Sequence, residues 1–110
     1  MAWLLRDGDV LAALEGDGGG WPATIQGAMV KRGPVLVHTM TCGAARDLAW
    51  CSDGTNDAGE PCLHVRRIAC LAPHRVGRPR LIGGAVVVAE EGAFERWALK
   101  VGDRLEIRAT

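Results

Sequence analysis

The sequence predicts a mostly β (α+β) fold, a compact β barrel or sandwich of about seven to nine short strands with one short helix near the C-terminus. Three observations lead to this prediction. Short apolar or alternating segments recur along the chain, separated by turn-forming Gly, Asp, Asn and Pro residues. A Val-rich run at residues 85–89 is typical of a buried strand. A single segment, near the C-terminus, has apolar residues at helical spacing.

Length and composition fit one folded domain, residues 1–110. The chain has 48% hydrophobic and 24% charged residues, and its 15 glycines indicate many turns. The formal net charge is zero, which excludes a general attraction to nucleic acid or to an anionic membrane. No apolar run is long enough to cross a bilayer and no export signal opens the chain, so we expect a cytoplasmic protein without a membrane partner.

The first half of the chain is predicted to contain strands and loops. A hairpin is expected around the Asp7-Gly8 step, because Asp-Gly supplies the positive φ of a tight turn. Residues 16–22 are rich in glycine and end in a proline, so they are expected to form a loop. The strands expected in this half are residues 3–5, 10–14, 28–31, 35–39 and 47–51.

The second half is predicted to hold the longest strands and the helix. Residues 52–61 carry almost no apolar side chain and are expected to be a solvated connection. Strands are expected at 62–71, 85–89 and 104–108. Between residues 91 and 100 the spacing of Phe94 and Trp97, with acidic residues first and Lys100 last, predicts a helix.

The C-terminal third also carries a longer pattern. Residues 84–97 read Gly-Ala-Val-Val-Val-Ala-Glu-Glu-Gly-Ala-Phe-Glu-Arg-Trp, and residues 99–107 read Leu-Lys-Val-Gly-Asp-Arg-Leu-Glu-Ile. The pattern resembles the closing strand, helix, turn and strand of the domain-of-unknown-function 192 family. Residues 75–80 and 3–15 are similar to the family's loop before that strand and to its first two strands.

The family's central signature is matched in part. His38, Thr39, Asp47 and Ala49 fit it, whereas Cys42, Ala45 and Arg46 stand where the family has Met, Pro and Ile. The glycine-rich loop replaces the family's early helical segment. The resemblance implies a small, mostly β domain, and the family has no established chemistry to carry over.

A candidate ligand-binding site is expected near residues 38–47. His38, Thr39 and Asp47 lie at either end of a predicted turn between strands, so their side chains can converge on one pocket. Arg75 and Arg78, in the loop of residues 75–80, are the candidate cations for an anionic group. The favoured alternative for the His38, Thr39 and Asp47 side chains is structural, because such groups often satisfy backbone amides beside a tight loop.

The four cysteines are expected to be free thiols, and no metal or cofactor is expected. Cys42, Cys51, Cys62 and Cys70 lack the close Cys pairs of structural zinc sites, so a zinc site with His38 is disfavoured. A Cys42 nucleophile activated by His38 is a further, less favoured alternative.

A basic stripe runs through residues 62–89, a segment without Asp or Glu. Its cations are Arg66, Arg67, Arg75, Arg78, Arg80, His64 and His74. Such a stripe is compatible with an anion or RNA. Stacking platforms for RNA need exposed aromatic side chains, and the chain has no Tyr and one Phe, so a solvated surface is favoured.

Three functional hypotheses result. The favoured one is a non-catalytic binding or accessory module whose partner is a small ligand or a protein. The second is a small enzyme in which His38 is the base and Asp47 orients it. The third is an anion- or RNA-binding module that uses the stripe from Arg66 to Arg80, nucleic acid being the less favoured partner. The sequence leaves the oligomeric state and the identity of the ligand open.

Overall fold

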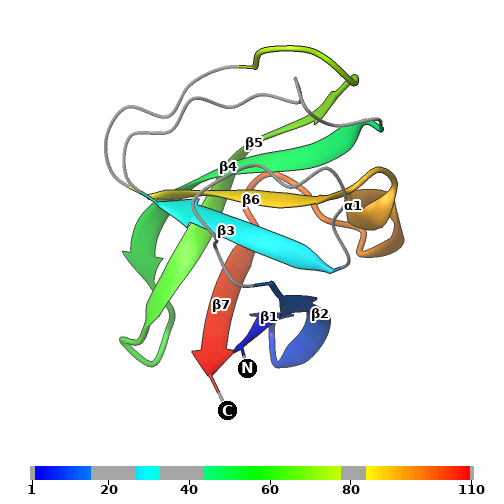
Figure 1. Cartoon of the computed structure of the whole chain (residues 1–110). Coiled ribbons are helices and arrows are strands. Elements are labelled where there is room, and N and C mark those ends of the chain that lie inside the picture. Colours follow the sequence, from blue (N-terminus) through cyan, green and yellow to red (C-terminus); the bar gives the residue numbers. More distant parts are fainter. Residues whose placement is uncertain (1, 16–26, 33–43, 78–83, 110) are drawn as a thin grey trace.

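The fold is that of a closed β barrel with a short helix at one end (Figure 1). The computed structural model describes residues 2–15, 27–32, 44–77 and 84–109. In these residues the strands are β1 (Ala2–Arg6), β2 (Asp9–Leu14), β3 (Ala28–Arg32), β4 (Arg46–Thr55), β5 (Pro61–Leu71), β6 (Ala85–Glu90) and β7 (Arg104–Ala109), and the helix α1 is Ala93–Arg96. The predicted mostly β class is confirmed. Of the two predicted architectures, the barrel is the one observed.

The barrel closes in the order β1-β2-β3-β6-β4-β5-β7. Strand β1 pairs antiparallel with both β2 and β7, and Ala2 lies opposite Ala109, so the first and last strands are neighbours. Strands β2 and β3 are parallel and meet where Leu14 lies opposite Ala28. At this seam the N–H of Glu15 donates to the carbonyl of Ala28 at 2.8 Å.

The predicted opening hairpin is confirmed. Asp7 and Gly8 join β1 to β2 with φ values of 51° and 83°. Positive φ at both central residues is the requirement of a type I′ turn, which Asp-Gly meets at low cost.

Two apolar clusters lie on opposite faces of the sheet. Strand β6 contributes Ala85, Val87 and Ala89 to one cluster and Val86 and Val88 to the other, because successive side chains of a strand point to opposite faces. The first cluster draws on β1, β3, β4, β5, β6, β7 and α1 and therefore fills the barrel interior. Burial on both faces explains why β6 is a continuous apolar run rather than an alternating one.

The solvated connection expected at residues 52–61 is shorter than predicted. Strand β4 continues to Thr55 and β5 begins at Pro61, so the turn spans residues 56–60. The side chain of Asn56 closes this turn by accepting from the N–H groups of Ala58 and Glu60, each at 2.9 Å. The prediction was wrong because the backbone ladder between Thr55 and Pro61 does not need apolar side chains, and exposed strand ends look like loops in sequence.

The helix expected at residues 91–100 is also shorter, with four residues in α1. Ala98 has a left-handed φ of 51°, which ends the helix. The Leu99 N–H donates to the Phe94 carbonyl at 2.9 Å and the Ala98 N–H donates to the Glu95 carbonyl at 3.0 Å. These two bonds form a Schellman motif with alanine in the position that glycine usually takes.

Two predicted segments lie outside the described residues. They are the loop at residues 16–22 and the strand at 35–39. The strands expected at 28–31, 47–51, 62–71, 85–89 and 104–108 are confirmed as parts of β3, β4, β5, β6 and β7.

Candidate functional site

Asp47 connects β4 to the start of α1. It is buried, and its Oδ2 accepts from the N–H of Gly92 at 3.1 Å and from the N–H of Phe94 at 3.0 Å. Gly92 precedes the helix and has no side chain to cap it, so the carboxylate of a distant strand satisfies these backbone donors. This is the structural role that the sequence analysis gave as the alternative for Asp47.

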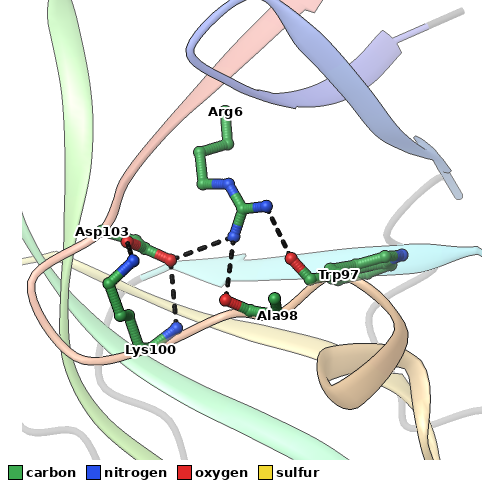
Figure 2. Close-up of polar contacts among 5 residues, drawn as sticks. All are labelled: Arg6, Trp97, Ala98, Lys100 and Asp103. Atoms are coloured by element: carbon green, nitrogen blue, oxygen red, sulfur yellow. Dashed lines mark hydrogen bonds and ion pairs between the residues drawn. The ribbon is translucent and has the colours of Figure 1, made fainter.

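Arg6 holds the other end of α1 (Figure 2). Its guanidinium donates to the carbonyl of Trp97, to the carbonyl of Ala98 at 3.2 Å and to the carboxylate of Asp103 at 3.1 Å. The two carbonyls belong to the last turn, where helix carbonyls lack partners within the helix. Two charged side chains from the strands, Asp47 and Arg6, therefore fix the short helix at both ends.

Asp103 completes this anchor. It accepts from the Lys100 N–H at 3.0 Å and from the Lys100 ammonium at 3.1 Å, in addition to Arg6. Burial by itself would raise the pKa of Asp103, but the hydrogen bonds from Lys100 and Arg6 together outweigh it and hold the pKa below its ordinary value. The charged form of Asp103 is thus stabilised by the fold.

An open pocket lies between β5 and α1, with a volume of about 560 Å³. We call it the helix-side pocket. Its lining consists of Asp47 from β4, Ile68, Ala69 and Cys70 from β5, and Glu91, Gly92, Phe94, Glu95, Ala98 and Leu99 around α1. Asp47 lies opposite both Cys70 and Ala89, and Ala89 belongs to the interior cluster, so this part of the pocket is on the inner side of the barrel wall.

The pocket combines apolar walls with negative charge. Ile68, Phe94 and Leu99 supply apolar surface, while Glu91 and Glu95 are exposed carboxylates at its edge. The Cys70 thiol lies 3.8 Å from Oε2 of Glu91. Desolvation and the negative charges of Asp47 and Glu91 raise the pKa of Cys70 to about 11.

A second, smaller pocket of about 240 Å³ lies toward the other end of β4. Arg32 and Asp53 line it together with Leu63, Leu105 and Ile107. The two charged groups form an ion pair at 3.3 Å, so they already neutralise one another.

The predicted site residues are placed in part. Asp47 lines the helix-side pocket, and Arg75 is exposed, its guanidinium 3.5 Å from the His74 carbonyl. His38, Thr39 and Arg78 lie outside the described residues, so their predicted convergence with Asp47 stays a prediction.

Sequence reasoning missed most of the pocket lining. In the sequence, Ile68 and Cys70 belong to a predicted strand, and Glu91 and Glu95 are charges that favour a helix. The signal for a site is weak in each case, because these residues meet only after β5 and α1 have come together.

The described part of the basic stripe lies on β5 and the segment after it. The Arg66 Nε donates to Oγ of Ser52 at 2.8 Å, and the Arg67 guanidinium lies 5.8 Å from the centre of the Trp50 ring. Both arginines are exposed, and their side chains contact residues of the paired strand β4. Arg80 and Arg78 lie outside the described residues.

Cys51 and Cys62 are buried free thiols, and burial raises the pKa of Cys51 to about 12. Cys70 is free and exposed, and Cys42 lies outside the described residues. Over the described ranges, the structure brings together no group of three His, Cys, Asp or Glu side chains suited to a metal ion. The described residues contain no helix with the length and apolar character that a membrane span requires.

Comparison with protein-family models, with curated proteins and with solved structures finds no match to this chain. Membership of the domain-of-unknown-function 192 family therefore stays a prediction based on the residues quoted above.

Proposed function

We propose that the protein is a non-catalytic binding module and that the helix-side pocket is where its ligand binds. The observation that carries this proposal is the pocket itself, about 560 Å³ between β5 and α1. That volume lies within the range of small-molecule sites, which is about 300–1,000 Å³. Such sites combine mainly apolar walls with a few polar groups, as Ile68, Phe94 and Leu99 do with Glu91 and Glu95.

The anchoring of α1 supports a preformed site. Asp47 holds the first backbone amides of the helix region, and Arg6 holds its last carbonyls. Because Phe94 and Leu99 line the pocket from this anchored segment, little ordering is needed when a ligand binds.

The chemistry of the pocket favours binding over catalysis. One carboxylate oxygen of Asp47 already accepts two backbone hydrogen bonds, so this group is engaged in holding α1. The Cys70 thiol, whose pKa is about 11, is protonated at neutral pH and is a weak nucleophile in that form. Both groups are better suited to shaping the pocket than to reacting.

A neutral apolar probe tests the proposal. The ¹⁵N-labelled protein is titrated with n-hexanol and the amide shifts are followed by NMR. We expect saturable shifts at Cys70, Phe94 and Leu99. Weak, unsaturable changes spread over the whole barrel would contradict the proposal.

A matched pair of variants controls for unspecific effects. Ile68→Ala removes apolar wall from the helix-side pocket and should weaken n-hexanol binding by about threefold or more, given ~0.8 kcal/mol per buried methylene. Ile107→Ala makes the same chemical change in the smaller pocket and should leave the affinity unchanged. Thermal unfolding of both variants verifies that each is folded.

The two alternative functions stay predictions. A small enzyme would use His38 with Asp47, and an anion- or RNA-binding module would use the stripe from Arg66 to Arg80. For the latter, binding has to weaken steeply with added salt.

A further inference from the structure

The charges around the helix-side pocket are not balanced. On the short segment beside it, Glu90 pairs with Arg96 at 2.7 Å, whereas Glu91 and Glu95 form no ion pair with the described residues. Arg6 and Lys100, which also lie close to this segment, are both paired with Asp103. The rim therefore carries two carboxylates whose charge is left to solvent.

The Cys70 thiol lies beside two carboxylates of the pocket. Asp47 lies opposite it in the strand ladder, and Glu91 lies within 3.8 Å of its sulfur. Besides desolvation, these two negative charges raise the pKa of Cys70, because they oppose the formation of a thiolate. The charges of Asp47 and Glu91, unlike the desolvation, would favour a positive group in the same place.

We propose that the ligand of this pocket is a small organic cation, an alkyl- or arylammonium ion whose apolar body lies on Ile68, Phe94 and Leu99 and whose ammonium group faces Glu91 and Glu95. This inference rests on the proposed function and adds the chemical class of the ligand. The carboxylates are exposed, whereas Phe94 is buried and Ile68 and Leu99 are half-buried, so one molecule with a charged end and an apolar body satisfies both.

The expected selectivity is modest because the carboxylates are exposed. Each exposed charge contributes about two- to fivefold in affinity, in line with ion pairs measured at protein surfaces. Added salt should reduce this preference, since screening acts on exposed charges.

The experiment compares three probes of equal chain length by the same NMR titration at pH 7. We expect n-hexylammonium to bind most tightly, n-hexanol next and n-hexanoate least. Glu91→Gln and Glu95→Gln should each weaken n-hexylammonium binding by about two- to fivefold more than they change n-hexanol binding. The control is Glu60→Gln, which removes the same charge from the exposed turn before β5 and should change neither affinity.

The outcomes separate the two proposals. If n-hexanol binds in the pocket but n-hexylammonium binds no more tightly, the cation assignment is overturned and the proposed function stands. If n-hexanol gives no localised shifts, the proposed function falls, and the cation assignment with it. A fourth probe, Nα-acetyl-lysine N-methylamide, presents the same cation on a peptide. If it binds more tightly than n-hexylammonium, a lysine of a protein partner replaces the small amine as the ligand.

Discussion

The guanidinium of Arg6 lies 3.1 Å from the carboxylate of Asp103 and connects the first strand to the turn before the last one (Figure 2). The same guanidinium binds the carbonyls that end α1. This single side chain thus joins strand β1, helix α1 and the approach to β7. Figure 2 shows the three acceptors arranged around its planar group.

Arg6→Lys tests this anchor. An ammonium group cannot place donors at three acceptors as the planar guanidinium does, so we expect a loss of about 1–2 kcal/mol in the free energy of unfolding. Urea unfolding measures this loss. The control is Arg108→Lys, which alters an exposed pair with Glu106 and should cost less than about 0.5 kcal/mol. Equal effects of the two substitutions would show that Arg6 has no special role.

Asp103 should make the stability depend on pH at the acidic end. Its pKa in the folded protein lies below the ordinary value that applies in the unfolded chain. The stabilisation is therefore fully present above the unfolded pKa, about 4, and is lost as the pH falls toward the folded pKa. Urea unfolding from pH 6 to pH 2 should show a shallower decline for Asp103→Asn than for the parent. The same slope in both proteins would contradict this assignment.

Asp47→Ala should destabilise the fold by about 2–3 kcal/mol, because the buried N–H groups of Gly92 and Phe94 lose their acceptor. Asp47→Asn retains one side-chain oxygen and should cost less. Thermal or urea unfolding of both variants measures which of them loses more stability. If Asp47→Ala is as stable as the parent, the carboxylate does not hold α1, and a role in ligand chemistry becomes the better explanation of this residue.

Ala98→Gly should stabilise the protein. Ala98 has a φ of 51° at the end of α1, and an alanine there costs about 1–2 kcal/mol that glycine does not. The greater freedom of glycine in the unfolded chain offsets part of the gain, which leaves about 0.5 kcal/mol. The midpoint of thermal unfolding should therefore rise. Ala93→Gly, in the helix itself, should lower it.

Features that depend on neighbouring residues could be predicted from the sequence. Asp7-Gly8 identified the first hairpin because the turn needs positive φ at both positions, and residues 85–89 identified β6 because both of its faces are buried. The sequence does not predict the strand ends near Thr55 and Pro61, because a solvent-exposed strand end has the composition of a loop.

Features that depend on distant partners could not be predicted. Asp47 binds the amide of Phe94 across 47 positions in the chain, and Arg6 binds the Trp97 carbonyl across 91. The periodicity of a segment predicts which of its faces is buried. It does not predict which distant carboxylate binds the first amides of a helix. The same reason hid the helix-side pocket, whose walls come from β5 and α1. The sequence predicts a longer α1 because Trp97 continues the helical spacing of Phe94, whereas the left-handed φ of Ala98 ends the helix.

The most direct test of the account is the position of an apolar ligand relative to α1. Isotope-filtered nuclear Overhauser spectra of the ¹³C,¹⁵N-labelled protein with unlabelled n-hexanol give that position. A ligand in the helix-side pocket should give contacts from its methylene protons to the ring of Phe94 and the methyl groups of Leu99. Contacts to Leu63 and Ile107 in the smaller pocket, with none to Phe94 or Leu99, would contradict it.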